Sequence, residues 1–499
     1  MNALAPTSFA LTGLVDRTEV LSITGNAGVM VSGLSCDSRS IVPGDLFFAL
    51  AGSRENGGRF ALEAEERGAV GVVSDQGLDG LVIPVVRVPS ARPAMADVAA
   101  AYYGFPSSSL AVAGVTGTNG KTTTAWIMRH LCETVGRSCG LIGTIEYVLP
   151  GMVEKALHTT PESLDLQRLL ARMRDGGFRA VSMEVSSHAL VQHRVRGIEF
   201  DAAVFTNLTQ DHLDYHGTMD AYFEAKSTFF TMLATQKKKG RAIINADDRY
   251  GRRLMDRMGS HPLISYGQGS NCNFRASDIH YSSAGTVFRL DAKARSYLVR
   301  TPLIGLFNVY NTLAAMAAVS AMGLELRRVV TAVASIPQVP GRMQRVAGHR
   351  NFQAYVDYAH TPDALENVLK VLRQLAAARI ITVFGCGGDR DKGKRPLMAA
   401  VAERYSDMVI ITSDNPRSEE PMAIIRDAEK GLGRTTHEVY VDRESAIRRA
   451  IELAGANDII LIAGKGHESY QETSAGRVPF DDVSMTARAM AEKPSTETR

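Results

Sequence analysis

Short apolar runs separated by turn residues recur through the first hundred residues of the chain. The clearest are residues 44–50, 69–73 and 82–88. Apolar runs of this length between turn signals are typical of buried strands. The spacing predicts a small α/β domain over residues 1–109.

From residue 110 to about residue 340 the apolar runs are longer and alternate with helical patterns. The predicted strands are residues 111–116, 180–185, 202–206 and 241–245. Strands that alternate with helices form mainly parallel sheets with helices on both faces. Ligands of such sheets bind beyond the carboxyl ends of the strands, so the residues after each strand are the first candidates for a site.

A stretch with two prolines and a glycine, residues 336–342, predicts a domain boundary. Beyond it, predicted strands at residues 353–357, 380–384, 408–412, 438–441 and 458–463 alternate with helices that begin near residues 362, 394, 421 and 444. This pattern indicates a Rossmann-like, doubly wound domain. We therefore expect an α/β protein with domains at 1–109, 110–340 and 341–499, and a frayed tail after Lys493.

Composition narrows the class of protein but not its chemistry. The 499 residues are 45% hydrophobic and 22% charged, and the net charge of +3 gives no reason to expect a nucleic-acid or membrane partner. The five cysteines include no Cys-x-x-Cys pair, so neither a disulfide framework nor a zinc site follows. Without a basic leader or an apolar run of about eighteen residues, a cytoplasmic protein is expected.

The most specific motif is Gly-Val-Thr-Gly-Thr-Asn-Gly-Lys-Thr-Thr at residues 114–123, between a predicted strand and a helical pattern. The N–H groups of a glycine-rich turn and of a helix N-terminus can cradle an oligophosphate, while Lys121 and Thr122 would neutralise phosphate and hold magnesium. Val115 stands where the general P-loop formula has its first glycine. The motif still predicts use of a nucleoside triphosphate.

Carboxylates and imidazoles follow two of the central strands. Glu184, Ser186, Ser187 and His188 lie near the end of one, and Asp211, His212, Asp214 and His216 follow the other. These side chains would gather beside the phosphate loop. There Glu184 and Thr122 are plausible magnesium ligands, with His212 as a nearby nitrogen donor.

Other polar residues have a purely structural interpretation when read from spacing alone. Lys226, in a predicted helix at residues 220–233, is typical of a surface lysine whose stem packs on an apolar face. The segment 37–39, Asp-Ser-Arg, is typical of a solvated turn, and the lysine run 237–239 of a solvated loop. Asn308 and Asn311 lie at the start of a long apolar helix and could cap it or face an adenine.

Four strand ends of the C-terminal region carry charge and glycine. They are residues 357–362, 385–393, 413–417 and 464–468. Together they describe a pocket for a small, charged, zwitterionic ligand.

Six separated motifs, from Asp-Ser-Arg at 37–39 to Gly-Lys-Gly-His-Glu at 464–468, resemble in their order the Mur ligase family of amide-forming synthetases. The phosphate-loop variant is one that Mur ligases share with folylpolyglutamate synthetases. The resemblance covers nearly the whole chain. It implies an ATP-dependent ligase of peptidoglycan precursor synthesis, which adds meso-diaminopimelate to the D-glutamate of UDP-N-acetylmuramoyl-L-alanyl-D-glutamate.

The resemblance also implies roles for single residues at the nucleotide. The ATP phosphate loop would be Gly117, Thr118, Asn119, Gly120, Lys121, Thr122 and Thr123, with Asn308, Arg342 and Asp357 as contacts to the adenosine or the phosphates. Magnesium contacts are implied for Thr122, Glu184, His212 and Lys226, and the catalytic set is Lys121, Glu184, His212 and Lys226. Lys226 falls where the family carries a lysine carbamylated by carbon dioxide. This replaces the surface interpretation, because a carbamate is an anion that can hold a second magnesium.

Substrate contacts follow in the same way. The muramoyl-dipeptide nucleotide is implied to bind Ser38, Thr159, Thr160, Ser186, Gln192 and Arg194. The acceptor is implied to bind Arg390, Asp414, Asn415, Pro416, Arg417, Gly464 and Glu468. The chain departs from its relatives at His158, where they often have Asn, and at residues 53–55, so uracil contacts are not assigned.

The implied reaction passes the γ-phosphoryl of ATP to the γ-carboxylate of D-glutamate, and the acceptor amine then attacks the acyl phosphate. Arg417 would grip the far carboxylate of meso-diaminopimelate, where L-lysine presents an ammonium, and Glu468 would take the distal ammonium. His212 or Glu184 would assist proton movement. No cysteine or serine nucleophile is assigned.

Three alternatives remain. Arg417 argues against an L-lysine-adding relative, and the N-terminal domain argues against a folylpolyglutamate synthetase. A regulatory nucleotide-binding protein would explain the phosphate loop but not Lys226, Arg390 or Glu468. The expected partners are the two substrates and ATP, with no nucleic acid and no membrane insertion, and a monomer that closes over its substrates is expected.

Overall fold

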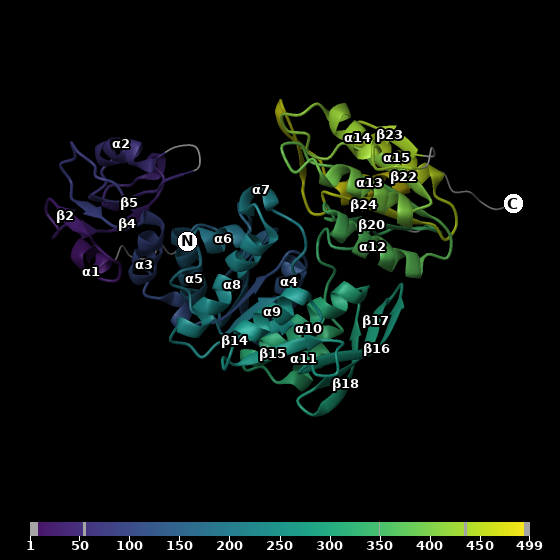
Figure 1. The fold of residues 1–499 in the computed structure, drawn as a ribbon, viewed down its shortest axis with the longest axis horizontal. Helices are drawn as coiled ribbons and strands as arrows, with labels where there is room; N and C mark the ends of the chain where they lie inside the picture. Colours follow the sequence, from purple (N-terminus) through teal and green to yellow (C-terminus); the bar gives the residue numbers. More distant parts are fainter. Residues whose placement is uncertain (1–7, 53–55, 349, 434–436, 494–499) are drawn as a thin grey trace.

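The computed structural model describes residues 8–52, 56–348, 350–433 and 437–493. Three sheets organise these residues, and Figure 1 shows the N-terminal and C-terminal sheets on opposite sides of a large central one. The predicted α/β class is confirmed. The sequence singled out the segment 53–55 and the tail after Lys493. Both lie outside the described residues.

The N-terminal region is built on a five-stranded sheet in the order β2-β7-β6-β5-β4. Its elements are β1 (Phe9–Ala10), α1 (Leu11–Val15), β2 (Ser22–Thr24), β3 (Met30–Val31), β4 (Gly33–Ser35), β5 (Asp45–Ala49), α2 (Ala61–Glu66), β6 (Gly71–Ser74), β7 (Val85–Arg87) and α3 (Ala91–Tyr102). Strands β4 to β7 are parallel, and β2 pairs antiparallel with β7. The apolar runs of the sequence form the buried strands β5, β6 and β7.

The central region carries an eleven-stranded sheet in the order β11-β10-β9-β12-β8-β13-β14-β15-β16-β17-β18. Its strands are β8 (Ala111–Thr116), β9 (Cys139–Ile142), β10 (Glu146–Leu149), β11 (Met152–Lys155), β12 (Ala180–Glu184), β13 (Ala202–Phe205), β14 (Arg241–Asn245), β15 (Leu263–Gly267), β16 (Phe274–Ser282), β17 (Gly285–Ala292) and β18 (Arg295–Thr301). The stretch from β9 to β15 is parallel, as predicted. The sequence pattern did not predict the hairpin β10–β11 or the strands β16 to β18, which pair antiparallel with one another. In β11, β16 and β18 exposed side chains interrupt the apolar pattern.

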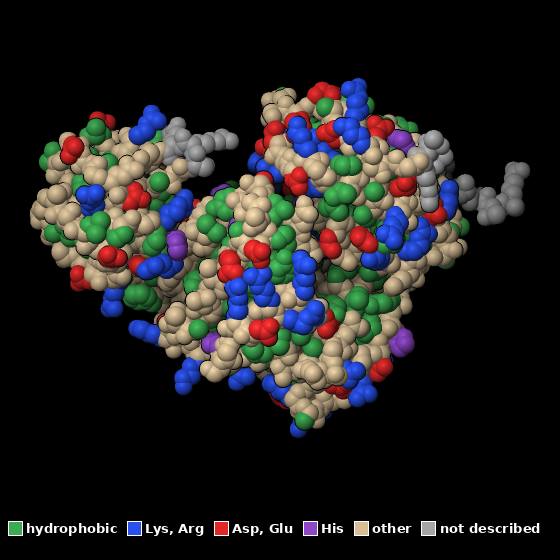
Figure 2. Space-filling model, viewed as in Figure 1, with side chains coloured by type: hydrophobic (Ala, Val, Ile, Leu, Met, Phe, Trp, Pro, Cys, Tyr) green, Lys and Arg blue, Asp and Glu red, His purple; other side chains and the backbone are tan. Residues whose placement is uncertain are grey.

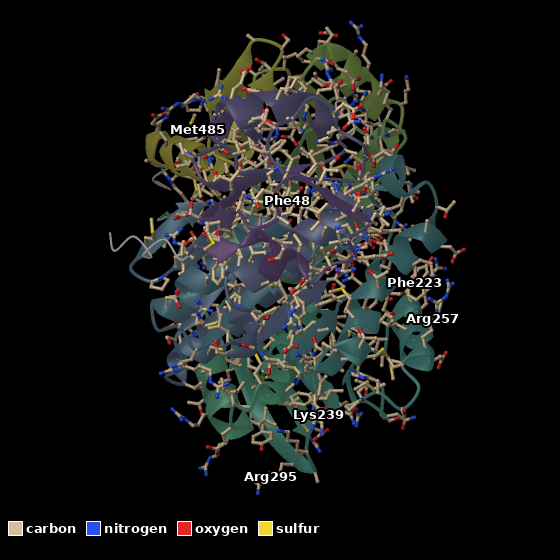
Figure 3. All side chains as sticks on the ribbon, turned by 90° about the vertical axis from the view of Figure 1, so that its left-hand side faces the viewer. Phe48, Phe223, Lys239, Arg257, Arg295 and Met485 are labelled. Atoms are coloured by element: carbon tan, nitrogen blue, oxygen red, sulfur yellow. The ribbon has the colours of Figure 1, made fainter. Side chains whose placement is uncertain are left out.

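Helices cover both faces of the central sheet. They are α4 (Lys121–Thr134), α5 (Ser163–Asp175), α6 (Ser187–Val191), α7 (Leu213–His216), α8 (Met219–Thr235), α9 (Arg249–Arg257), α10 (Leu306–Ala321) and α11 (Leu326–Val333). Helices α4, α10 and α11 share one apolar core, and α5, α8 and α9 share the other. The guanidinium groups of Arg253 and Arg257 on α9 lie 4.4 and 4.8 Å from the ring centroid of Phe223 on α8, which joins the two helices. Figure 3 labels Phe223 and Arg257.

The C-terminal region forms a six-stranded sheet in the order β19-β20-β24-β21-β22-β23. Its elements are β19 (Gln344–Arg345), β20 (Gln353–Asp357), α12 (Pro362–Leu375), β21 (Ile380–Phe384), α13 (Lys394–Tyr405), β22 (Met408–Thr412), α14 (Pro421–Glu429), β23 (His437–Tyr440), α15 (Arg443–Leu453), β24 (Ile459–Ala463), β25 (Tyr470–Thr473), β26 (Gly476–Pro479) and α16 (Asp482–Glu492). Helices α12 to α14 pack on one face and α15 and α16 on the other, which is the predicted doubly wound arrangement.

The sheets are joined by stretches without strands. Residues 334–343, between α11 and β19, contain the two prolines, and residues 103–110 connect α3 to β8. We propose 1–109, 110–340 and 341–499 as domains because their ends fall in these connections. Within the described ranges, no helix combines the length and apolarity needed to cross a membrane.

Candidate active site

The phosphate loop lies between strand β8 and helix α4, in the predicted strand–turn–helix context. Gly117 and Gly120 have φ angles of 148° and 88°. A Cβ atom at Gly117 would lie 1.9 Å from Thr206 Oγ1, and one at Gly120 would lie 2.4 Å from Asn311 Oδ1. Both positions therefore require glycine, through backbone conformation and through close approach.

The neighbouring strand end holds the loop in place. The Asn119 backbone N–H donates to Asn207 Oδ1 at 3.0 Å, and Thr206 Oγ1 donates to the Asn119 carbonyl at 2.6 Å. Lys121 Nζ donates to the carbonyls of Gly117 and Thr118 at 3.0 and 2.9 Å, and burial lowers its pKa. The loop thus has a fixed shape with a lysine folded back over it.

A cavity of about 550 Å³ opens over this loop. Of the predicted nucleotide residues, it is lined by Thr118, Asn119, Gly120, Lys121, Thr122, Thr123, Arg342 and Asp357. Figure 2 shows the molecule hollowed between its N-terminal and C-terminal lobes. Gly117, the first residue of the loop, does not line the cavity, and its carbonyl accepts hydrogen bonds from Lys121 and Lys226.

Thr122 and Glu184 lie in direct contact at the floor of this cavity. Thr122 Oγ1 donates to Glu184 Oε2 at 3.0 Å, and the backbone N–H of Thr144 donates to Glu184 Oε1 at 2.7 Å. Glu184 is 1% exposed. The described residues contain no cluster of three or more His, Cys, Asp or Glu that could hold a metal alone. One carboxylate and one hydroxyl beside a phosphate loop suit magnesium, which commonly completes its shell with phosphate oxygens and water.

His212 lines the same cavity but makes no direct bond to Glu184 in the described part of the chain. Its Nε2 lies 3.5 Å from Asp211 Oδ2, and its ring meets that of His188 edge-on at 4.9 Å. Burial lowers the pKa of His212 to about 4, despite the opposing charge of Asp211. The ring is therefore neutral near pH 7 and available as a nitrogen donor.

Lys226 is buried on α8, so the surface position that its spacing indicated is wrong. The side chain is 1% exposed and lies 4.6 Å from the centroid of the Tyr222 ring. Its Nζ donates to the Gly117 carbonyl at 2.9 Å and to Thr116 Oγ1 at 3.5 Å. Burial, and then the charge of Lys121, hold its pKa well below the ordinary value. By contrast, Lys239 of the predicted solvated run is exposed (Figure 3).

Of the three residues implied for the adenosine or the phosphates, Arg342 and Asp357 line the cavity and Asn308 does not. Arg342 Nη2 donates to Thr122 Oγ1 at 3.2 Å, and Asp357 accepts the N–H groups of Met343 and Ala359 at 2.6 and 2.7 Å. Asn308 does not line the cavity, because it lies behind Asn311 and accepts the amide of that residue at 3.2 Å. Asn311, for which the sequence left open a helix cap or an adenine contact, lines the cavity.

Five of the six residues implied for the muramoyl nucleotide line the first cavity. They are Thr159, Thr160, Ser186, Gln192 and Arg194. Arg194 donates to the Thr160 carbonyl at 2.7 Å and to Gln192 Oε1 at 2.6 Å, so this wall is already organised. Ser38 lies apart, in a 3-10 turn of the N-terminal region, where its hydroxyl donates to Glu63 at 2.9 Å.

A second cavity of about 610 Å³ lies at the strand ends of the C-terminal sheet. Of the residues implied for the acceptor, it is lined by Arg390, Asp414, Asn415, Arg417, Gly464 and Glu468. Arg417, at φ 54°, donates to the Gly388 carbonyl at 2.6 Å, and its Nε lies 3.5 Å from Glu472. Pro416 does not line the cavity. Its carbonyl instead lies against Gly388, where an added Cβ would come within 1.9 Å.

Lys465 organises this second cavity; it lies in the predicted pocket segment 464–468, but the sequence assigned it no role of its own. It is fully buried, and its Nζ lies 2.8 Å from Asn415 Oδ1, 3.2 Å from Glu468 Oε2 and 3.3 Å from Asp414 Oδ1. Asn415 Nδ2 donates to Glu468 Oε2 at 2.8 Å. Nothing in the sequence around Lys465 indicates that one lysine joins two strand ends.

The two cavities share a wall. The side chains common to both are His188, Asp211, His212, Tyr358 and His360. Only His212 among them was assigned a role from the sequence. The carboxyl ends of β12, β13 and β20 precede these residues, as the strand-end rule requires.

Three family models match the chain. The Mur ligase family catalytic domain matches residues 30–103, the Mur ligase middle domain residues 115–319, and the Mur ligase glutamate ligase domain residues 341–466. Together these matches cover most of the chain.

Curated relatives and a solved structure are similar over nearly the full length. The chain is 46% identical over 474 residues to the UDP-N-acetylmuramoyl-L-alanyl-D-glutamate–2,6-diaminopimelate ligase of Geobacillus thermodenitrificans, covering 94% of this chain and 96% of the relative. It is 43% identical to the enzyme of the same name from Geobacter sulfurreducens, covering 98% and 100%. A solved structure of a ligase of this name matches with a TM-score of 0.70 and 34% identity, covering 97% and 99%.

Proposed function

The chain belongs to the Mur ligase family, and on this basis we propose that it joins meso-diaminopimelate to the D-glutamate of UDP-N-acetylmuramoyl-L-alanyl-D-glutamate. It is an amide-forming, ATP-dependent ligase. The observation that supports the proposed reaction best is the common wall of the two cavities, one over a phosphate loop and one lined by acidic and basic side chains. A carboxylate activated in the first cavity would meet an amine held in the second.

The phosphate loop and Lys121 bind and orient the phosphates of ATP in this proposal. Thr122 and Glu184 would hold magnesium, with His212 nearby. The ion, when bound, offsets the negative charge of the phosphates. The D-glutamate γ-carboxylate attacks the γ-phosphorus, ADP leaves, and an acyl phosphate remains. Wall residues Thr159, Thr160, Ser186, Gln192 and Arg194 hold the muramoyl nucleotide with hydroxyls, an amide and a guanidinium.

Lys226 would carry a carbamate. The side chain is buried, and no carboxylate among the described residues lies within ion-pair distance of its amine. The amine therefore has no anionic partner there. A lowered pKa favours the neutral amine, which is the form that reacts with carbon dioxide. The carbamate is the anion that this position lacks. A ¹³C NMR signal after incubation with ¹³C-bicarbonate, present in the wild type and missing in Lys226→Met, tests this assignment.

The acceptor cavity suits an amino acid with two carboxylates and two ammonium groups. Arg417 would pair with the far carboxylate, and Asp414 and Glu468 would take ammonium groups. L-Lysine would place an ammonium beside Arg417, which disfavours L-lysine as the acceptor.

Since both cavities are lined by one chain, a monomer suffices for the proposed reaction. The nucleotide-linked substrate favours the cytoplasm as the location.

Phosphate release tests the proposal. We expect ATP-dependent release only when both UDP-N-acetylmuramoyl-L-alanyl-D-glutamate and meso-diaminopimelate are present. Omission of either substrate should abolish it, and Arg417→Ala should raise the KM for the acceptor but not for ATP. Release that needs neither substrate would contradict the ligase assignment to these two cavities.

A further inference from the structure

The proposed reaction requires a proton acceptor at the common wall of the two cavities. An amino acid binds as an ammonium at neutral pH, and only its deprotonated amine has a lone pair for attack on a carbonyl carbon. The base must therefore reach the acceptor in the second cavity and the acyl group in the first. Asp211, His188, His212 and His360 are the titratable side chains at this wall besides Tyr358, whose pKa burial raises.

His360 is held rigidly at this wall. It follows β20 by three residues, and the next residue, Thr361, caps α12 by accepting the backbone N–H of Ala364 at 3.3 Å. The His360 ring packs against the Tyr358 ring with centroids 4.6 Å apart. The cap places the backbone of this segment at the start of α12, and the contact with Tyr358 orients the imidazole.

One hydrogen bond decides the tautomer of His360. Its Nδ1 lies 2.8 Å from the backbone carbonyl oxygen of Tyr358. A carbonyl oxygen only accepts, so Nδ1 carries the proton and the neutral ring presents a lone pair at Nε2. The only hydrogen bond described for the ring is this one at Nδ1, which leaves Nε2 without a partner among the described residues.

Burial and the surrounding positive charges keep this ring neutral. Burial is the main cause of the lowered pKa of His360, followed by the charge of Lys394 at the start of α13 and, more weakly, that of Arg342. Asp211 opposes the shift, and His467 is a further titratable neighbour. Lys394 also lines the second cavity.

The other candidates are less suited. His212 is proposed as a magnesium contact, and Asp211 lies 3.5 Å from it. The His188 ring lies 4.1 Å from the Tyr215 ring, and no hydrogen bond described for it fixes its tautomer.

We propose that His360 Nε2 takes the proton from the attacking ammonium of the acceptor. The freed nitrogen lone pair forms the C–N bond at the acyl phosphate carbon. As the C–O bond to phosphate breaks, the departing phosphate takes the second proton from nitrogen. The products are the amide, hydrogen phosphate and a His360 imidazolium, which returns its proton to water. This inference rests on the ligase function proposed above.

Hydroxylamine separates this role from a structural one, because it is already uncharged near neutral pH and needs no base. We expect His360→Gln to lose about 10²- to 10³-fold in turnover with meso-diaminopimelate, within the range usual for general bases. Formation of the hydroxamate of the muramoyl dipeptide from hydroxylamine and ATP should stay within about twofold of the wild type. His130→Gln is the control. Burial also lowers the pKa of this histidine, which lies 3.0 Å from Ser335 Oγ and lines neither cavity, so both rates should be unchanged.

A pH profile gives a second readout. In His360→Gln, kcat/KM for meso-diaminopimelate should rise about tenfold per pH unit between pH 7 and 9, because only free amine reacts. The wild type should stay nearly flat there. Equal loss of both products in His360→Gln, or full retention of turnover with meso-diaminopimelate, would overturn the inference. If the wild type itself makes neither product, the proposed ligase function fails and this inference with it.

Discussion

Two fully buried lysines at the two cavities have opposite surroundings. Lys465, at the acceptor cavity, lies within 3.3 Å of the carboxylates of Asp414 and Glu468. Lys226, under the phosphate loop, donates only to a carbonyl and a hydroxyl, with no carboxylate in ion-pair range among the described residues. A buried charge is tolerated when it is paired and is otherwise neutralised or modified. The comparison indicates that Lys465 stabilises the folded structure around its cavity, whereas Lys226 contributes to the proposed reaction.

Replacement of Lys465 should give the largest effect on stability. Lys465→Met leaves two carboxylates facing each other without a cation, and the loss of one partner of a buried pair is worth about 3–5 kcal/mol. Denaturant unfolding of the wild type and the variant measures this difference. A Lys465→Met protein as stable as the wild type would mean that the pair contributes nothing to the fold.

Replacement of Lys226 should lower turnover without lowering stability, in contrast to replacement of Lys465. Lys226→Met removes a buried amine that has no anionic partner among the described residues, so the free energy of unfolding should not fall below that of the wild type. Turnover should nevertheless drop by about 10²- to 10³-fold, because the proposed carbamate, which would help to hold magnesium at the transferring phosphoryl group, is lost. Phosphate release and denaturant unfolding on the same preparation give both values. Loss of stability with intact turnover would reverse the comparison.

Arg417→Lys should affect the acceptor cavity more mildly. A lysine keeps the charge but loses the bidentate geometry, and we expect about 2 kcal/mol weaker acceptor binding, or roughly a 30-fold higher KM. The KM for ATP should not change, since Arg417 does not line the first cavity. Steady-state kinetics with each substrate varied in turn measures both constants.

The pH dependence of stability should report on Lys226. The pKa of Lys226 is lowered in the folded state, so between that lowered pKa and the ordinary value of 10.5 the unfolded state binds one more proton. Stability should therefore rise with pH in this range, by up to ~1.4 kcal/mol per unit, relative to Lys226→Met. Unfolding in buffers free of carbon dioxide measures the difference between the two proteins. Parallel curves would show that Lys226 does not titrate in this way.

Much of the fold was predictable because its parallel strands are buried on both faces and appear as continuous apolar runs. Strands β20, β21 and β22 have the predicted bounds, while β16 and β18, in which exposed and buried side chains are interspersed, carry no such signal. The phosphate loop was predictable because its chemistry is local in sequence. The surroundings of Lys226 and Lys465 were not, since their partners come from other strand ends, and only a resemblance gave Lys226 a role. His360 lay in a segment singled out from the sequence, but its tautomer depends on one backbone contact that no sequence pattern shows.

The most direct test of the proposed function is a competition between acceptors. The protein is incubated with ATP, magnesium, UDP-N-acetylmuramoyl-L-alanyl-D-glutamate and equal concentrations of meso-diaminopimelate and L-lysine, and the products are identified by mass. We predict that the diaminopimelate adduct accounts for nearly all of the product. A lysine adduct in comparable amount would contradict the role of Arg417, and no adduct at all would contradict the ligase assignment.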